Sequence, residues 1–342
     1  EPLVNLCKKK KLSAFKHLGF WQCMDTKRDK DLLEKNFQKL KKSKKNILVV
    51  GGTGFIGYHL IKKSLKNYYN VTSISSKKPS KPKFLKKVKY IICDIRNFNQ
   101  LKKKIDNNFD YVVNLGGYVD HTKKKETYTS HYYGCKNLAK IFLEKSITSF
   151  VQIGSGLEYG KLKTPHKEEQ KGSPNSTYAS AKYKATKYLI SLYKTNKIPI
   201  SIIRLYQAYG PEQEFNRLIP SAIKRCLQNE KFPCTKGLQK RDFLYIDDLI
   251  NLIFKILKSK KAHGQIINAG SGKPIQVRKL IHYIKKISKG GKPEYGKIKM
   301  RKDEPLNMYP SIKKAKRLFK WKPKFSIQKG LKKTIKFYSK II

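Results

Sequence analysis

Tyr178 and Lys182 are the two residues whose types and spacing best suit proton transfer. They stand four positions apart, so both would lie on one face of a helix. A lysine cation beside a phenol lowers its pKa from the usual value of about 10, so we expect Tyr178 to exchange a proton near neutral pH. Ser155, which directly follows an apolar run, can hydrogen-bond the same substrate oxygen. These three residues are the predicted catalytic group.

A glycine-rich turn is predicted to hold a dinucleotide. It follows the apolar run 46–50 and precedes a segment of helical spacing at 59–65. Backbone at such a turn must bend tightly, approach a pyrophosphate and pack against the sheet, and the helix N-terminus offers free N–H groups. A purely structural turn would not need three glycines at this spacing. The predicted cofactor contacts in the turn are Gly51, Gly54, Phe55, Ile56 and Gly57.

The end of the second predicted strand, 71–75, indicates which dinucleotide is preferred. An acidic residue usually stands there and holds a ribose hydroxyl of NAD, but this strand ends in Ser75, Ser76 and Lys77. Hydroxyls and cations suit a 2′-phosphate, so NADP(H) is the preferred cofactor. NAD(H) remains the alternative, because lysine is common in every loop of this chain. Asp94 and Ile95, at the end of the third predicted strand, are expected near the adenine.

Strands and helices must alternate to position these residues. Short apolar runs predict strands at 46–50, 71–75, 90–94, 111–115, 150–153 and 198–205, with helices between them that include 98–106, 134–146 and 178–195. Such alternation predicts an α/β fold, a Rossmann-type doubly wound parallel sheet with helices on both faces. We expect a dinucleotide-binding domain at 46–210 and a smaller substrate-binding subdomain at 211–342, with 241–272 returning to the Rossmann core.

Composition excludes several classes of protein. The 342 residues are 39% hydrophobic, which is too many for a wholly disordered chain, and no apolar run is long enough to span a bilayer. The six cysteines show no metal-binding or disulfide spacing, so no metal is predicted and a reducing compartment fits them best. The first residues lack a secretory signal, so a cytoplasmic location is expected.

The net charge of +55 is typical of a nucleic-acid-binding protein. The excess is nearly all lysine, spread from end to end, and arginine makes up only about 9 of the 78 basic residues. Arginine is the side chain that reads bases and phosphates bidentately. We therefore interpret the charge as a lysine bias of solvated faces, and expect neither a specific nucleic acid nor a membrane as a partner.

From residue 46 onward the chain resembles the extended short-chain dehydrogenases/reductases of the NAD-dependent epimerase/dehydratase family, which act on nucleotide sugars. Beyond the residues above, the resemblance is carried by Asn114-Leu115-Gly116-Gly117, Tyr159-Gly160, Arg204-Leu205-Tyr206-Gln207, Tyr209-Gly210-Pro211, Arg241-Asp242-Phe243, Tyr245-Ile246-Asp247-Asp248 and Asn268-Ala269-Gly270-Ser271-Gly272. It implies hydride transfer with a nicotinamide. Tyr178 is then the acid/base, Lys182 orients the cofactor and tunes Tyr178, and Ser155 polarises the substrate oxygen.

The same resemblance implies further contacts and a homodimer formed through two helices of the dinucleotide domain. Leu115, Gly116, Gly117, Tyr206, Tyr178 and Lys182 would contact the cofactor. Gln207 and Arg241 would contact the substrate, and Arg241 would bind its diphosphate in place of forming a surface salt bridge.

Departures from the family pattern narrow the reaction. Dehydratases of the family carry an acidic pair directly after the Ser/Thr, where this chain has Gly156 and Leu157, so dehydration is not expected. His131 and Gln207 stand where the family usually has Asn, which puts the details of substrate contact in doubt. His121 and His131 could be additional acid/base groups, although a lone histidine is more often structural.

Residues 1–45 lie outside that fold. They resemble the C-terminal end of glucose-1-phosphate cytidylyltransferase, through Gly19-Phe20-Trp21-Gln22-Cys23-Met24-Asp25-Thr26 and Arg28-Asp29. The alternative is an unrelated helical extension. In that family the aspartate matching Asp25 helps hold the catalytic metal, but the transferase's nucleotide loop is absent here. The resemblance implies a fused or associated cytidylyltransferase, and hence a CDP-sugar.

Taken together, the sequence predicts an NADP(H)-dependent reductase of a CDP-linked 4-keto-deoxyhexose that serves surface polysaccharide biosynthesis. One alternative is an NAD-dependent nucleotide-sugar epimerase, which needs the same Ser, Tyr and Lys. A second is an RNA-binding member of the fold that has lost catalysis, which only the charge suggests.

Overall fold

The computed structural model describes residues 2–9, 25–42, 44–118, 120, 122–300 and 304–342. The chain divides into two compact units, Glu1–Lys44 and Lys45–Ile342. The first unit contains α1 (Pro2–Lys8) and α2 (Lys27–Lys42). Thr26 and Asp29 cap α2 reciprocally: the Asp29 N–H donates to Thr26 Oγ1 (3.1 Å), and the Thr26 N–H donates to Asp29 Oδ2 (3.2 Å).

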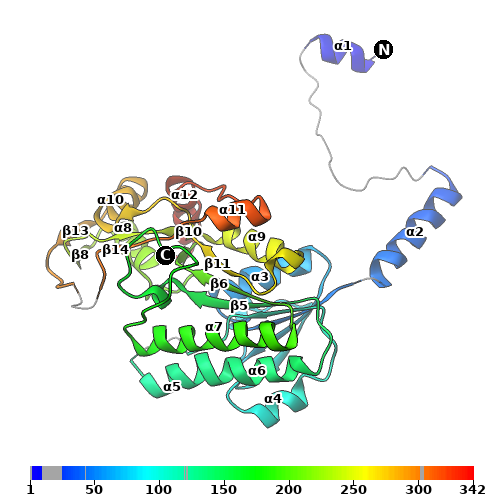
Figure 1. The fold of residues 1–342 in the computed structure, drawn as a ribbon. Coiled ribbons are helices and arrows are strands. Elements are labelled where there is room, and N and C mark those ends of the chain that lie inside the picture. The colour runs from blue at the N-terminus through cyan, green and yellow to red at the C-terminus, as the bar shows by residue number, and fades with distance from the viewer. Residues whose placement is uncertain (1, 10–24, 43, 119, 121, 301–303) are drawn as a thin grey trace. The chain divides into compact units, whose positions relative to one another are not determined.

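Seven parallel strands form the central sheet of the second unit, in the order β11-β6-β5-β4-β1-β2-β3 (Figure 1). This arrangement confirms the predicted Rossmann-type fold. The chain builds outward from β1 to β3 and then returns to β4, so the strand order reverses between β1 and β4, where this architecture binds ligands. The strands are β1 (Asn46–Val50), β2 (Asn70–Ser75), β3 (Val88–Ile92), β4 (Tyr111–Asn114), β5 (Ser149–Ser155), β6 (Ile200–Leu205) and β11 (Ile266–Ala269).

Helices cover both faces of this sheet, because successive strand residues point to opposite faces. In β1, Ile47 and Val49 join one apolar core, while Leu48 and Val50 join the other. The first core is covered by α3 (Phe55–Lys66) and α9 (Ile246–Leu257). The second is covered by α4 (Phe98–Lys104), α6 (Gly134–Leu143) and α7 (Thr177–Asn196), which Figure 1 shows together on one side of the sheet. Immediately before α6 come α5 (Lys124–Tyr128) and the π-helical turn η2 (Thr129–Tyr133).

After residue 205 most strands lie outside the central sheet. Three small sheets form there: β7 (Gln207–Tyr209) with β10 (Phe243–Tyr245), β9 (Lys240–Arg241) with β12 (Ile275–Gln276) and β14 (Asn307–Met308), and β8 (Lys231–Cys234) with β13 (Lys292–Tyr295). The helices of this part are α8 (Leu218–Leu227), α10 (Val277–Ser288), α11 (Lys313–Phe319) and α12 (Ile327–Tyr338).

β11 and β3 are two of the strands that differ from the sequence prediction. β11 lies in the segment 241–272 that was expected to return to the core, but no strand was predicted there. β3 ends two residues before the predicted limit at Asp94, so Asp94 and Ile95 follow the strand.

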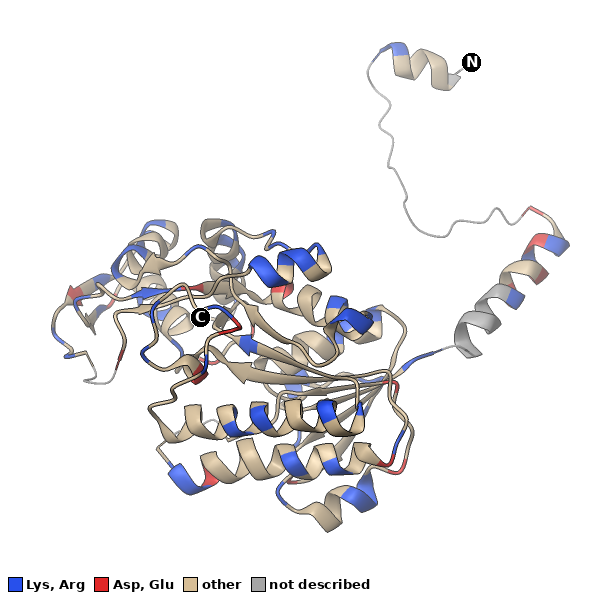
Figure 2. Ribbon diagram, viewed as in Figure 1, with Lys and Arg blue, Asp and Glu red and all other residues tan. Residues whose placement is uncertain are grey.

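Lysine and arginine are scattered over helices and connecting segments throughout residues 45–342 (Figure 2). This distribution fits the interpretation of the charge as a bias of solvated surfaces. Within the described part of the chain, no helix is long and apolar enough to cross a membrane. The described residues also contain no cluster of His, Cys, Asp and Glu able to hold a metal ion.

Candidate active site

Ser155, Tyr178 and Lys182 come from two neighbouring elements and meet at the carboxyl end of β5. Ser155 is the last residue of β5 and the N-cap of the short helix η3 (Gly156–Tyr159). Tyr178 lies in the first turn of α7, and its side chain is hydrogen-bonded with Ser155. Lys182 follows one turn later, with its Nζ 5.9 Å from the centroid of the Tyr178 ring. The structure therefore brings the three predicted residues together.

Burial controls the protonation of this group. It raises the pKa of Tyr178 to about 12, against the opposing hydrogen bond with Ser155. Burial also lowers the pKa of Lys182 to about 8, and the Lys182 ammonium donates to the Ile153 carbonyl oxygen at 2.7 Å. The expectation that Tyr178 titrates near neutrality beside the lysine is therefore wrong for the protein by itself. The cost of desolvating a phenolate is the larger effect.

The His131 ring packs against the Tyr178 ring. His131 lies in the π-helical turn η2, and its ring meets the Tyr178 ring edge-on at a centroid distance of 4.9 Å. Its Nε2 is 3.2 Å from the Tyr118 carbonyl oxygen. Gly117 makes room for it, because a Cβ at that position would lie 1.8 Å from His131 Cε1. His121, the other histidine considered, lies outside the described residues.

The glycine turn between β1 and α3 fits a dinucleotide. Gly51 has a φ of +78°, and a Cβ on Gly57 would lie 2.3 Å from the Gly51 carbonyl oxygen, so the fold itself requires both glycines. Gly54 is different: a Cβ there would meet only the Gly51 carbonyl oxygen, at 3.5 Å. Gly54 is also exposed and is the N-cap of α3, where it provides no side-chain cap. This leaves an open surface and free N–H groups, at Phe55 and Ile56, for an anion.

At the end of β2, one buried residue is followed by three exposed ones. Ser75 is buried, and its Oγ accepts from the Thr53 N–H at 3.3 Å, so it supports the glycine turn. Ser76 and Lys77 are exposed, as is Lys78. The two lysines are therefore accessible to an anionic group at this end of the strand.

The predicted adenine contacts and the predicted cofactor contact Leu115 also lie at the carboxyl ends of strands. Asp94 accepts from Arg96 Nη2 at 2.6 Å, and this partner lowers the pKa of the carboxyl group. The exposed turn that they form follows β3. Ile95 is buried between Gly116 and Gly134, where a Cβ would lie 3.1 Å and 2.6 Å from its side-chain carbons. Leu115 follows β4, directly beside the Gly51 turn.

Tyr206 and Gln207 follow β6. The Tyr206 ring is buried beneath η3, because a Cβ on Gly156 would lie 2.8 Å from it. Its hydroxyl donates to His166 Nδ1 at 2.7 Å, since the other ring nitrogen of His166 faces the Leu162 carbonyl oxygen. Gln207 has an exposed side chain on β7. The Tyr206 ring therefore lies beside Gly156, next to Ser155, and the contacts of Tyr206 with the cofactor and of Gln207 with the substrate stay predictions.

Arg241 lies on β9 with a buried side chain. Its Nη2 donates to Glu304 Oε1 at 2.6 Å, and its Nη1 donates to the carbonyl oxygens of Lys240 (2.9 Å) and Leu306 (3.2 Å). This is a partly buried ion pair and not a surface one, since the Arg241 side chain is 8% exposed. Its role toward a diphosphate stays a prediction.

Two residues near the catalytic group were missed by the sequence analysis. Glu158 is fully buried and forms a capping box with Ser155, and the spacing Ser-x-x-Glu was a visible signal for it. Arg217, the N-cap of α8, lies close enough to Tyr178 to oppose the rise of its pKa. Arginine is scarce in this lysine-rich chain, and this scarcity was the sequence signal that could have drawn attention to Arg217.

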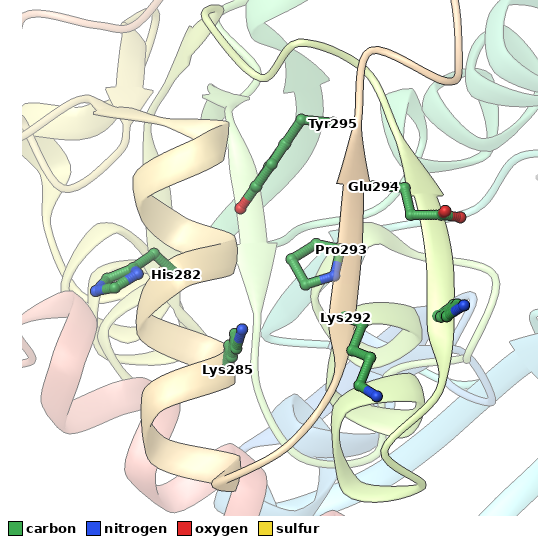
Figure 3. A pocket seen from close by; sticks show the side chains of 7 residues that line it. His282, Lys285, Lys292, Pro293, Glu294 and Tyr295 are labelled. Atoms are coloured by element: carbon green, nitrogen blue, oxygen red, sulfur yellow. The ribbon is translucent and has the colours of Figure 1, made fainter.

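A separate surface pocket of about 340 Å³ lies between α10 and strands β8 and β13 (Figure 3). It is lined by Lys231, His282, Lys285, Lys292, Pro293, Glu294 and Tyr295. None of the predicted site residues lines it. Lysines are common over the whole surface, so this pocket alone does not indicate a ligand.

Comparison with known proteins identifies the family. The sequence profile of the NAD dependent epimerase/dehydratase family matches residues 47–270, which is more than half of the chain. The chain belongs to this family. It is therefore an enzyme of the NAD dependent epimerase/dehydratase type, and the matched region holds every predicted site residue.

Relatives in this family act on different nucleotide sugars. The chain is 28% identical to CDP-abequose synthase of Salmonella muenchen, over 85% of this chain and 97% of the relative. It is also 28% identical to dTDP-D-glucose 4,6-dehydratase of Homo sapiens, over 86% and 90% of the two chains. Among solved structures, UDP-glucuronic acid 4-epimerase of Bacillus cereus, in complex with UDP-glucuronic acid and NAD, matches with a TM-score of 0.80 and 26% identity. That match covers 87% of this chain and 100% of the epimerase.

Proposed function

We propose that this family member is an NADP(H)-dependent reductase of a CDP-linked 4-keto-deoxyhexose, in deoxysugar and surface polysaccharide biosynthesis. The observation that carries the proposal is the meeting of Ser155, Tyr178 and Lys182 at the carboxyl end of β5. This group lies on the same edge of the sheet as the glycine turn that fits a dinucleotide.

A bound reduced nicotinamide supplies the hydride that the carbonyl carbon of the sugar accepts. Tyr178 donates its phenolic proton to the carbonyl oxygen, which becomes the new hydroxyl group. A pKa of about 12 keeps this proton on Tyr178 until negative charge develops on the oxygen, which suits reduction. Ser155 hydrogen-bonds the same oxygen, and Lys182 directs its cation toward the cofactor and Tyr178.

Dehydration would need a further acid/base after Ser155. Gly156 and Leu157 carry none, and the Tyr206 ring occupies the space beside Gly156. The next acid, Glu158, is fully buried and already accepts three hydrogen bonds. Hence this relative of dTDP-D-glucose 4,6-dehydratase is better suited to reducing a ketosugar than to forming one.

The cofactor preference rests on the exposed turn after β2. Structural neighbours bind NAD, as the B. cereus epimerase does. In this chain the turn has no acid, and Ser76, Lys77 and Lys78 are free to face solvent. Ser75 is buried, and its hydroxyl oxygen accepts from the Thr53 N–H, so it is less accessible to a phosphate than these exposed residues. The 2′-phosphate of NADP(H) would therefore be held by the two lysines and Ser76.

A CDP-sugar is favoured by two independent likenesses. One is the similarity to CDP-abequose synthase over 97% of that protein. The other is the resemblance of residues 1–40 to a cytidylyltransferase, whose most distinctive stretch, 19–24, lies outside the described residues. A fused or associated cytidylyltransferase is part of the proposal, as are Arg241 and Gln207 as contacts of the sugar nucleotide.

We also propose that the enzyme is a homodimer in the cytoplasm. Members of the family commonly pair through two helices of the dinucleotide domain. In the run from η2 into α6, Tyr133 and Leu143 leave apolar surface exposed, at 48% and 38% of their maximum. Such surface is suited to burial against a second copy.

NAD-dependent epimerisation is the second candidate. The B. cereus 4-epimerase, solved with UDP-glucuronic acid and NAD, has the same fold and 26% identity. An epimerase would use the same Ser155, Tyr178 and Lys182 but would regenerate its cofactor within each turnover. Tightly bound NAD in the purified protein would favour it.

The deciding experiment follows the oxidation of NADPH and NADH by absorbance. The substrate is CDP-4-keto-6-deoxyglucose, compared with the dTDP and GDP analogues. We expect rapid NADPH oxidation with the CDP-sugar alone. Equal rates with all three nucleotides would contradict the CDP assignment. No oxidation with any of them would contradict reduction and favour the epimerase.

A further inference from the structure

Glu158 is a buried carboxylate directly behind the predicted catalytic serine. Its Oε1 accepts from the Ser155 N–H at 2.8 Å, and its Oε2 accepts from Thr186 Oγ1 and Arg204 Nε, both at 2.9 Å. Gly154 provides the necessary room, because a Cβ there would lie 2.4 Å from Glu158 Oε1. The carboxylate is therefore held in one orientation by groups from three directions.

These contacts join the three elements that build the active site. Ser155 belongs to β5, Thr186 lies on α7 one turn beyond Lys182, and Arg204 lies on β6. Arg204 is 2% exposed, and its guanidinium carbon lies 4.4 Å from the centroid of the Tyr159 ring. The buried charges of Glu158 and Arg204 stay paired, because separating them would leave each one desolvated and without a partner.

Glu158 does not contact a substrate in this arrangement. It is fully buried, and the donors of its three hydrogen bonds lie on β5, β6 and α7. A purely structural role would be satisfied by any pair that fills this space. The contact with Ser155 is different, because that N–H belongs to the residue whose hydroxyl is hydrogen-bonded with Tyr178.

The charge of Glu158 also reaches the catalytic residues. It raises the pKa of Tyr178, together with burial and against Ser155 and Arg217. It raises the pKa of Lys182 against the larger effect of burial, as Cys135 on α6 does. His131 on η2 and the cation of Arg204 are the other titratable or charged groups that face this cluster.

We propose that Glu158, held by Arg204, is a positioning residue that fixes Ser155 relative to Tyr178. The inference rests on the proposed reductase function only for its kinetic test. The geometry itself predicts that removing the carboxylate moves Ser155, whatever sugar the enzyme uses.

The kinetic test compares Glu158→Ala and Glu158→Gln with the unchanged protein. In Glu158→Ala we expect kcat to fall about thirty- to a hundredfold, because small misplacements of reacting groups cost about this much. KM for NADPH should stay within about twofold, since the glycine turn is not touched. Glu158→Gln keeps an oxygen for the Ser155 N–H but removes the charge. It should recover most of kcat while the alkaline limb of the pH profile moves to lower pH.

Two further variants separate positioning from folding. Replacing the pair together, Glu158→Met with Arg204→Met, exchanges a buried ion pair for apolar groups, which buried pairs often tolerate. This variant should stay folded and still lose kcat. Asp248→Asn is the matched control, because Asp248 is another buried carboxylate that accepts backbone N–H groups, of Lys324 (2.9 Å) and Phe325 (3.0 Å), but faces no catalytic residue. It should lower the melting temperature without changing the pH profile.

Crystal structures of the unchanged protein and of Glu158→Ala provide a test that does not depend on the substrate. We expect the Ser155 hydroxyl to separate from Tyr178 in the variant. An unmoved Ser155, or a folded double-methionine variant with normal kcat and pH profile, overturns the positioning role. An unchanged protein that reduces no ketosugar overturns only the proposed reductase, because the comparison of the two crystal structures still decides for or against Glu158.

Discussion

The predicted catalytic group and the predicted cofactor-binding rim, the exposed turns that include Ser76 and Lys77, are built in opposite ways. Ser155, Tyr178 and Lys182 lie on a long strand and a long helix, and burial shifts the pKa values of both titratable members. The rim consists of exposed turns and short strands, where Ser76 and Lys77 face solvent. Interactions in a buried site are strong and sensitive to geometry, whereas exposed charges are screened. The two regions should therefore respond differently to substitution.

The largest effect is expected in the buried region. Tyr178→Phe removes the proton donor while keeping the ring that packs against His131. Turnover should fall by about two to four orders of magnitude, with little change in NADPH binding. Steady-state kinetics with the ketosugar and fluorescence titration of NADPH measure the two quantities. Near-normal turnover would show that another group donates the proton.

The alkaline pH dependence should be the next largest effect. Burial lowers the pKa of Lys182 to about 8, so its cation is present below that pH and lost above it. If the cation is needed, kcat should fall about fiftyfold between pH 8 and pH 10, approaching tenfold per pH unit. Lys182→Arg keeps its charge over this range, so its slower turnover should lack this limb. The same limb in that variant would assign it to a different group.

Much of the fold could be predicted because apolar runs mark buried parallel strands. In β1 the four residues after Asn46 are all buried, and the predicted limits match those observed. β11 was missed because only Ile266 and Ile267 are large apolar residues there. Its place at the edge of the sheet comes from pairing with β6, which is a tertiary interaction that a local pattern does not contain.

The site could be predicted as a set of residues but not as an electrostatic environment. Residue spacing brought Tyr178 and Lys182 onto one helix face, yet it could not show that burial would raise the pKa of Tyr178. Similarly, spacing could not show that Ser75 is buried with its hydroxyl oxygen accepting from the Thr53 N–H. In both cases the missing information was which groups lose contact with water.

Arg241 shares a feature with each region. It is a buried charge, and it lies at the proposed substrate diphosphate site. Its present partner is Glu304, and a diphosphate would compete with that carboxylate for the guanidinium. Arg241→Ala should raise KM for the nucleotide sugar about thirtyfold, with a smaller change in kcat, because it removes the buried partner of an anion. Arg241→Lys should recover only part of the affinity, since lysine lacks the fork geometry. An unchanged KM in Arg241→Ala would assign the arginine a purely structural role.

The smallest effect is expected at the exposed turn after β2. Lys77→Ala with Lys78→Ala should weaken NADPH binding about fivefold, because exposed ion pairs each contribute up to about 1 kcal/mol. NADH binding should change little, as it has no 2′-phosphate for these cations. The matched control is Lys66→Ala with Lys63→Ala, two lysines in the last turn of α3, at the opposite end of that helix from the glycine turn. Fluorescence titrations of both cofactors at low and at physiological salt measure the effect, which should shrink as salt rises. Equal losses for NADPH and NADH would reject the 2′-phosphate contact and leave NAD(H) as the preferred cofactor.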